Sequence, residues 1–268
     1  MKKILAVFLA CAFILTGCGS KTEDENIIKV MCTVDPHSII LEEAKPLLED
    51  KGYQLEIQTT DNYYIPNEAV SNGEIDANYF QHVIFFEGEK EKDDYKISNA
   101  GAIHLEPFGL YSKTIKNISE LKQGAQIVIS NSVADHGRIL SLLESAQLIT
   151  LKEGIVKSDA TEADITSNPL NLTFKEVAPE LLTTTFENGE GDLVAINGNY
   201  ALQGGLNPVK DAVILESSQD NPYVNIVVCQ EGKENDPKIV ALIEVLTSDK
   251  IKTFIESKYQ GSVIVANQ

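Results

Sequence analysis

Arg138 is the residue whose chemistry stands out first. The chain has 22 lysines and arginines, and Arg138 is the only arginine among them. It stands in QIVISNSVADHGRILS (126–141), in what reads as a loop between an apolar strand and a helix, directly after Gly137, which would let the backbone approach a ligand. A guanidinium presents a rigid fork that fits carboxylate oxygens, which lysine cannot imitate. We therefore predict that Arg138 binds a ligand carboxylate; the alternative is a surface salt bridge to one of 40 acidic residues.

Further polar and aromatic side chains fall at the ends of predicted strands. Asn197 ends DLVAIN, and Asn225 lies within NPYVNIVVC. Their amides can donate to a carboxylate or accept from an ammonium. Tyr63, Phe80 and His82 lie near the ends of neighbouring segments and would add an aromatic wall. Such a wall beside a few convergent polar groups is typical of a pocket for an amino acid with an apolar side chain.

Metal binding is a second possibility for the polar residues. The four histidines are His37, His82, His104 and His136. Three of them with a carboxylate could hold zinc or manganese, although their spacing is not diagnostic and no cysteine–histidine zinc pattern occurs. We expect no resident metal and no cofactor.

Catalysis and nucleic-acid binding find little support in the sequence. P-loop, nucleophile-elbow and HExxH motifs are absent, and acidic runs such as EGEKEKDD are typical of a solvated helix face. The formal charge of −18 makes a surface that repels nucleic acid and anionic lipid headgroups. We therefore expect a binding protein rather than an enzyme.

The first residues read as an export signal. Two lysines precede the apolar run ILAVFLACAFI (4–14), which is too short for a stable membrane span. LTGC (15–18) follows and is similar to a bacterial lipobox, which predicts cleavage before Cys18 and lipid on that cysteine; a plain secretory signal is the alternative. The polar stretch GSKTEDEN would then tether a domain outside the cytoplasm, at the membrane surface.

Two cysteines remain after removal of the signal. Cys32 and Cys229 both lie in apolar, strand-like runs. An exported compartment would permit a disulfide between them. We favour two buried thiols that behave as small hydrophobic residues.

Strand-like and helical patterns alternate along the chain in two successive series. Apolar runs at 27–34, 125–131 and 223–229 predict strands, and helical spacing at 37–52, 136–148 and 236–261 predicts helices. The alternation predicts a two-lobed α/β fold with mostly parallel sheets and a ligand cleft between the lobes. The predicted parts are a signal peptide (1–17), a lipidated tether (18–26), the first part of lobe 1 (27–112), lobe 2 (113–220) and a return segment of lobe 1 (221–268).

Several motifs together give a resemblance to a known family. They include NYYIPNEAVSNGEIDANYFQH (62–82), GLYSKTIKNISELKQGAQIVISN (109–131), GRILSLLESAQLITLKEG (137–154), VAINGNYALQGGLNP (194–208) and NPYVNIVV (221–228). In these motifs the chain resembles the NlpA-type methionine-binding lipoproteins, which are substrate-binding subunits of methionine ABC importers. The resemblance covers essentially the whole mature chain.

The resemblance implies a periplasmic-binding-protein fold without enzymatic activity, an amino acid ligand with L-methionine foremost, and a membrane permease with its ATPase as partners. It implies that Arg138 clamps the ligand carboxylate and that Asn197 and Asn225 hold its amino and carboxylate groups. It also implies that Tyr63, Phe80 and His82 surround the thioether. D-methionine, a methionine-containing dipeptide and another small amino acid stay open as ligands.

Asp135 departs from the family pattern. Relatives often carry an asparagine two places before the Gly-Arg pair, whereas this chain has Asp135 there. A carboxylate at this point could pair with Arg138 or bind the ammonium group of the ligand.

Overall fold

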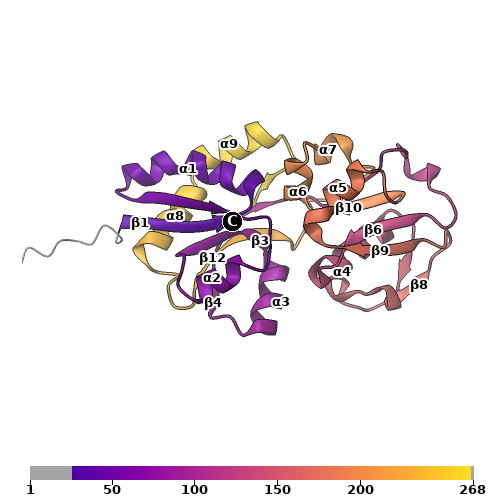
Figure 1. Cartoon of the computed structure of the whole chain (residues 1–268), viewed down its shortest axis with the longest axis horizontal. Helices are drawn as coiled ribbons and strands as arrows, with labels where there is room; N and C mark the ends of the chain where they lie inside the picture. The colour runs from indigo at the N-terminus through magenta and orange to yellow at the C-terminus, as the bar shows by residue number, and fades with distance from the viewer. Residues whose placement is uncertain (1–25, 267–268) are drawn as a thin grey trace, which may run out of the picture.

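The computed structural model describes residues 26–266, so the predicted signal peptide, the lipidation site at Cys18 and most of the tether lie outside the described residues. The chain forms two lobes that lie side by side along the long axis of the molecule (Figure 1). Each lobe is built around a twisted sheet with helices on both faces, which confirms the predicted two-lobed α/β fold. Within residues 26–266, no helix is long and apolar enough to cross a membrane.

The first lobe contains a six-stranded sheet in the order β13-β4-β12-β3-β1-β2. Its strands are β1 (Ile27–Cys32), β2 (Gln54–Thr59), β3 (Ala77–His82), β4 (Ile97–Leu105), β12 (Val224–Gln230) and β13 (Ile264–Val265). β1, β2 and β3 are parallel, whereas β12 and β13 pair antiparallel with their neighbours. Segments at the two ends of the described chain therefore share one sheet.

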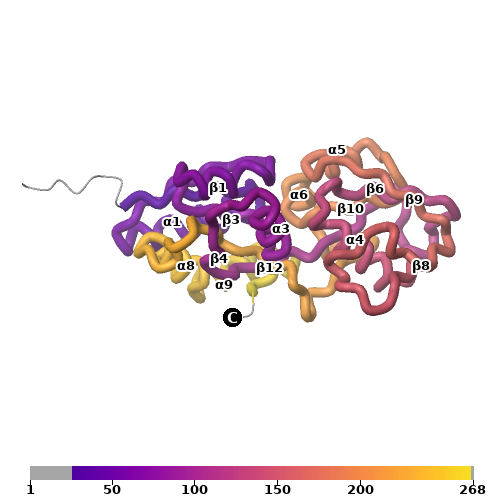
Figure 2. Tube along the Cα trace, turned by 90° about the horizontal axis from the view of Figure 1, so that it is seen from below, coloured from indigo at the N-terminus to yellow at the C-terminus, as the bar shows by residue number. Residues whose placement is uncertain are grey.

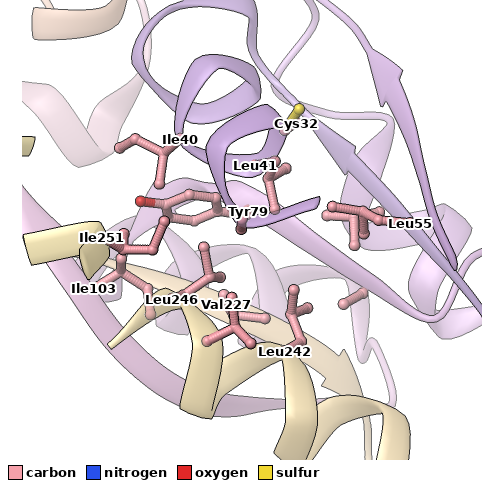
Figure 3. Packing of buried hydrophobic residues seen from close by; sticks show 14 of the residues in the cluster. Cys32, Ile40, Leu41, Leu55, Tyr79, Ile103, Val227, Leu242, Leu246 and Ile251 are labelled. Carbon is pink, nitrogen blue, oxygen red and sulfur yellow. The ribbon is translucent and has the colours of Figure 1, made fainter. Parts of the chain in front are cut away.

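Helices cover both faces of this sheet. The helices α1 (Ile39–Asp50), α8 (Pro237–Leu246) and α9 (Asp249–Tyr259) bury one apolar face against it. The helices α2 (Pro66–Ser71) and α3 (Val83–Asp93) lie on the opposite side, where Val70 and Phe86 pack on Ile226 and Val228. Tyr79 lies at the centre of the larger core, between side chains of α1 and of the C-terminal helices (Figure 3).

The second lobe contains a five-stranded sheet in the order β11-β5-β10-β6-β9. Its strands are β5 (Gly109–Tyr111), β6 (Gln126–Ser130), β9 (Thr173–Val177), β10 (Leu193–Ile196) and β11 (Ile214–Leu215). A separate two-stranded ribbon consists of β7 (Thr150–Leu151) and β8 (Ile165–Ser167). The α-helices of this lobe are α4 (Val133–Ser145), α5 (Leu182–Glu187), α6 (Gly198–Gln203) and α7 (Pro208–Asp211). Its short helical turns are η3 (Ile118–Glu120), η4 (Lys157–Asp159), η5 (Glu162–Asp164) and η6 (Pro179–Leu181). A further short helical turn, η2 (Val34–Ser38), belongs to the first lobe.

Most strands of each sheet run in one direction, as the sequence predicts, but each sheet also contains antiparallel strands. In the first lobe β12 lies antiparallel between β3 and β4, and in the second lobe β5 pairs antiparallel with β10 and β11. These antiparallel strands adjoin the segments that cross between the lobes (Figure 2). A strand that carries the chain out of a lobe, or back into it, need not follow the direction that βαβ units impose on the others.

The crossing between the lobes begins earlier than the sequence predicts. Gly109–Tyr111 pairs with strands of the second lobe, so the chain crosses between Leu105 and Gly109 rather than after residue 112. The return crossing runs between Leu215 and Val224.

Cys32 and Cys229 are free and buried in the core of the first lobe, which agrees with the preferred prediction of two apolar thiols. Burial raises the pKa of the Cys32 thiol to about 12 and that of Cys229 to about 11. Both thiols are therefore protonated and poorly reactive near neutral pH.

Candidate functional site

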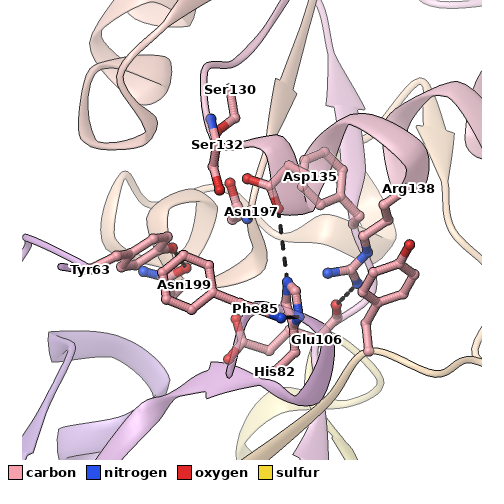
Figure 4. A network of polar contacts seen from close by, with 12 residues as sticks. Tyr63, His82, Phe85, Glu106, Ser130, Ser132, Asp135, Arg138, Asn197 and Asn199 are labelled. Atoms are coloured by element: carbon pink, nitrogen blue, oxygen red, sulfur yellow. Dashed lines mark hydrogen bonds and ion pairs between the residues drawn. The ribbon is translucent and has the colours of Figure 1, made fainter. Parts of the chain in front are cut away.

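A pocket lies between the lobes and contains every binding residue that the sequence predicts. It encloses about 410 Å³ of unfilled space, its mouth included. The first lobe contributes Tyr63, Phe80 and His82, the second lobe contributes Arg138 and Asn197, and Asn225 comes from the start of the returning strand β12. Figure 4 shows the polar side chains of the second lobe directed toward the aromatic residues of the first.

The aromatic wall belongs to the first lobe. Tyr63 lies in the loop before α2, Phe80 lies near the end of β3, and Phe85 lies in the first turn of α3. The ring centroids of Tyr63 and Phe80, Tyr63 and Phe85, and Phe80 and Phe85 are 5.8, 5.9 and 5.9 Å apart. Phe85 was not predicted from the sequence as a pocket residue, because the side of α3 on which it lies depends on the residue at which the helix begins.

His82 caps α3, and this role fixes its tautomer. Its Nδ1 accepts a hydrogen bond from the backbone N–H of Phe85 at 3.1 Å. The neutral ring therefore carries its proton on Nε2, which lies 3.9 Å from Oδ1 of Asp135. Burial lowers the pKa of His82 despite the nearby carboxylate. His82 thus offers the pocket a neutral N–H donor near neutral pH.

Arg138 lies in the second turn of α4, not in a loop, because the helix begins at Val133. Its side chain is 4% exposed, so the surface salt bridge considered above is replaced by a buried one. Nε and Nη2 donate to the two carboxylate oxygens of Glu216 at 2.8 and 2.6 Å, and Nη2 also donates to the carbonyl of Glu106 at 2.8 Å. Burial alone would lower the pKa of Arg138, but Glu216 outweighs burial and raises it.

The guanidinium plane is also held by aromatic rings. Its central carbon lies 4.3 Å from the ring centroid of Tyr223 and 5.1 Å from that of Phe108, distances typical of cation–π contacts. Both rings stand on the segments that cross between the lobes. Within residues 26–266, Nη1 is the one guanidinium nitrogen that no protein group engages, and Arg138 lines the pocket.

Gly137 has a packing role rather than the predicted role in ligand approach. A Cβ added at Gly137 would lie 2.2 Å from the carbonyl oxygen of Ser158 and 2.4 Å from that of Lys157. The turn η4 packs directly on the helix here, so only a hydrogen fits.

Asp135 places a buried negative charge opposite the aromatic wall. It is 2% exposed, and its Oδ1 accepts a hydrogen bond from Nδ2 of Asn197 at 3.1 Å. Burial alone would raise its pKa, but His82, Arg138 and Ser130 outweigh burial and lower it. Oδ1 of Asn197 is buried, and no described residue donates to it. Two acceptors, a carboxylate and an amide oxygen, therefore lie together.

Asn199 joins the two lobes and was missed by sequence reasoning. The hydroxyl of Tyr63 donates to Oδ1 of Asn199 at 2.6 Å, whereas Nδ2 of Asn199 is buried without a partner among the described residues. Tyr200 stacks on Tyr63 with ring centroids 5.1 Å apart. The motif NGN (197–199) was the available signal in the sequence, since it places a second asparagine two residues after Asn197, at the start of α6.

A histidine–glutamate cluster lies beneath Asn225. It consists of His37, His104 and Glu106, which are all buried and could in principle hold a metal ion. Nε2 of His104 and Nε2 of His37 lie 2.8 and 3.3 Å from Oε1 of Glu106. These separations are those of hydrogen-bonded or paired groups. The structure thus brings together two of the four histidines, whereas His136 binds the carbonyl of Ser130 elsewhere.

Comparison with known proteins gives a consistent result. The model of a family described as NlpA lipoprotein matches residues 28–267. The methionine-binding lipoprotein MetQ of Bacillus subtilis is 50% identical over 274 residues, with all of both chains covered. Among solved structures, a nutrient-binding protein from Burkholderia cenocepacia bound to methionine has a TM-score of 0.84 at 32% identity, covering 90% of this chain and 100% of that one. A periplasmic substrate-binding protein of an ABC transporter from Coxiella burnetii has a TM-score of 0.84 at 37% identity, covering 89% and 100%.

Proposed function

The chain belongs to the NlpA lipoprotein family, and we propose that it is the substrate-binding lipoprotein of an ABC importer. In this role it captures an amino acid, L-methionine foremost, and delivers it to a membrane permease driven by an ATPase. Lipid on Cys18 holds it at the outer face of the cell membrane, with residues 18–26 as the tether. The relatives named for methionine and for ABC transport support this assignment.

The observation that carries the proposal is a buried cation and a buried anion in one pocket. Arg138 and Asp135 both line it, and an aromatic wall faces them. An amino acid is a zwitterion with a carboxylate and an ammonium on one carbon, so its carboxylate can bind Nη1 of Arg138, which Glu216 leaves free, while its ammonium pairs with Asp135. Removing water from the pocket strengthens both attractions, because the local dielectric constant falls.

Each ligand group has a matching surface in the pocket. Nη1 of Arg138 is available for the carboxylate, and Asp135 with Oδ1 of Asn197 is available for the ammonium. Tyr63, Phe80 and Phe85 would surround the side chain, where a thioether gains about 0.3–1.5 kcal/mol against an aromatic edge. We expect the lobes to close on the ligand by a hinge at the two crossings.

Binding of purified protein tests the proposal. The chain from residue 19 onward would be unfolded and refolded to strip bound ligand, then titrated with L-methionine by calorimetry. Saturable one-to-one binding with a Kd of about 1 μM or tighter supports the proposal. The absence of both heat and thermal stabilisation at a large excess of L-methionine contradicts it, since a bound ligand must stabilise the fold.

The same titrations separate the alternative ligands. D-methionine inverts the arrangement around the charged carbon, and a methionine-containing dipeptide moves the ammonium away from the carboxylate. Tighter binding of either one than of L-methionine would identify it as the ligand and replace L-methionine in the proposal. Mass spectrometry of the material released on unfolding names the ligand acquired in the cell.

A further inference from the structure

His37 is a fully buried histidine outside the pocket, and it contacts a pocket residue. Its Nε2 lies 3.1 Å from Oδ1 of Asn225 and 3.3 Å from Oε1 of Glu106. Its Nδ1 lies 2.7 Å from the hydroxyl oxygen of Thr33. Each ring nitrogen therefore has a polar partner, and the ring also packs edge-on against Tyr79, with ring centroids 4.6 Å apart.

The surroundings of His37 select one tautomer. A bare nitrogen lone pair at Nε2 would face the carboxylate of Glu106, which is an acceptor, so Nε2 carries the proton. Nδ1 then accepts from the hydroxyl of Thr33. Burial lowers the pKa of His37 to about 4, which leaves the ring neutral near neutral pH. His104 repeats the arrangement, with Nε2 toward Glu106 and Nδ1 paired with the hydroxyl of Tyr79.

This tautomer orients the amide of Asn225. An N–H on Nε2 requires an acceptor opposite it, so the amide oxygen of Asn225 faces His37 and the amide nitrogen is turned away. Asn225 lines the pocket between the lobes. We infer that His37 is a positioning residue that locks Asn225 with Nδ2 toward the pocket, which makes Asn225 a donor for the ligand carboxylate and not an acceptor for its ammonium. This inference rests on the proposed function.

The polar partners of His37 come from several segments of the first lobe and from the first crossing, and they hold its ring in place. Thr33 directly follows β1 and His37 lies in η2. His104 is the penultimate residue of β4, and Glu106 lies on the crossing to the second lobe. A Cβ added at Gly198, at the start of α6, would lie 2.7 Å from Oε2 of Glu106. Residues of both lobes therefore pack against the carboxylate of Glu106, which is also a partner of His37.

Ligand selectivity is the first test. L-methioninol keeps the ammonium and thioether of methionine but lacks the carboxylate. We expect His37→Leu to weaken L-methionine binding about tenfold, the scale of one lost hydrogen bond, and to leave L-methioninol binding within about twofold. His104→Leu is the matched control, because it removes a buried histidine of the same cluster whose side chain bonds Tyr79 and Glu106 rather than the amide of Asn225, although the two residues pair on neighbouring strands; it should keep the wild-type selectivity. Equal losses for both ligands in His37→Leu would overturn the inference.

A double-mutant cycle tests whether His37 acts through Asn225. In an Asn225→Ala background, His37→Leu should have no further effect on methionine affinity, because the amide that it orients is gone. An undiminished tenfold effect in that background would assign His37 a purely structural role. Thr33→Val provides a milder variant if His37→Leu fails to fold, and it should show the same selectivity change at smaller size.

A ligand-free measurement separates this inference from the proposed function. Nitrogen-15 NMR of the histidine rings reports which nitrogen of His37 is protonated in the stripped wild-type protein. A proton on Nε2 is the expected result, and a proton on Nδ1, or zinc bound at Nε2, would refute the lock. Failure of wild-type protein to bind any amino acid would instead refute the proposed function, with the NMR result still standing.

Discussion

At the scale of single residues, the pocket contains a buried cation, Arg138, and a buried anion, Asp135, which are held in place by different neighbours. Arg138 is held by Glu216 and by two aromatic rings, so its charge is placed before any ligand arrives. Asp135 is held by Asn197 and faces His82. Because these side chains are already ordered by the protein, ligand binding loses less side-chain conformational entropy.

Arg138→Lys is expected to weaken methionine binding severely, by about 30-fold or more. The ammonium of lysine keeps the charge, but it cannot bind Glu216 with two parallel hydrogen bonds and still present a donor to the ligand. Calorimetric titration measures the affinity, and circular dichroism checks that the fold is retained. A loss within about threefold, below roughly 0.7 kcal/mol, would remove Arg138 from the binding role.

Asp135→Asn tests the predicted ammonium site. The pKa of Asp135 is lowered, so the wild-type side chain is ionised near neutral pH and would attract an ammonium. The variant should bind L-methionine about tenfold or more weakly, because charge-assisted hydrogen bonds contribute about 1.5–3 kcal/mol. Binding of N-acetyl-L-methionine, which has no ammonium, should not weaken.

The exposed Asp94→Asn is the matched control for this change of charge, because residue 94 has a left-handed backbone that asparagine tolerates. A similar loss for methionine and N-acetyl-L-methionine in Asp135→Asn would argue against an ammonium site at Asp135.

At the scale of elements, α4 connects the pocket to the body of the second lobe. It carries Asp135 and Arg138 one turn apart, on the face that lines the pocket, while Ile139, Leu140 and Leu143 pack in the core. Its position depends on close packing of η4 at Gly137.

Gly137→Ala should therefore disturb both stability and binding. The added methyl group would overlap two backbone carbonyl oxygens, which a side-chain movement cannot relieve. We expect a loss of about 1–3 kcal/mol in the free energy of unfolding, the range for overpacking, together with weaker methionine binding. Denaturant unfolding and calorimetry measure the two effects.

Gly88→Ala is the control for this glycine. Gly88 lies in the exposed face of α3, and a Cβ there would meet no atom within 4 Å. Alanine should stabilise this helix by about 0.5–1 kcal/mol. A Gly137→Ala variant as stable as Gly88→Ala would show that η4 moves away readily.

At the scale of the whole molecule, the lobes meet through polar contacts around the pocket and through the two crossings. The hydroxyl of Tyr63 in the first lobe donates to Asn199 in the second, and the hydroxyl of Tyr200 in the second lobe donates to the backbone carbonyl of Asp61 in the first. Each lobe therefore supplies one donor and one acceptor. The buried histidine cluster lies where the first crossing leaves β4.

Acid should destabilise the whole fold through this cluster. Burial lowers the pKa of His37 to about 4 and of His104 to about 3, from 6.5. Between pH 6.5 and about 4 the unfolded chain therefore binds more protons than the folded chain, so the free energy of unfolding falls as pH falls. Glu106 opposes part of this loss, because burial raises its pKa and it gains a proton earlier in the folded state.

The variant His104→Leu isolates this effect. Its free energy of unfolding, measured by denaturant titration at several pH values, should fall less steeply over this window, by about 1.4 kcal/mol per pH unit. An unchanged slope would mean that His104 becomes protonated within the folded protein.

The sequence by itself determined the local and compositional features of this protein. Apolar periodicity located β1, β6, β12, α1, α4 and the C-terminal helices α8 and α9, because burial of one face imposes a spacing that neighbouring residues reveal. The types of Arg138, Asn197 and Asn225 indicated a polar pocket, because few side chains offer a fixed fork or a two-way amide.

The tertiary structure alone decided what these residues contact. The pairing of Arg138 with Glu216, 78 positions away, and the contact of His37 with Asn225, 188 positions away, have no local signal. The same holds for the clash that keeps Gly137 a glycine and for the direction of the strands next to the crossings. Such features depend on which distant segments pack together, and that is set by the burial of the whole chain rather than by the spacing of residues within any one segment.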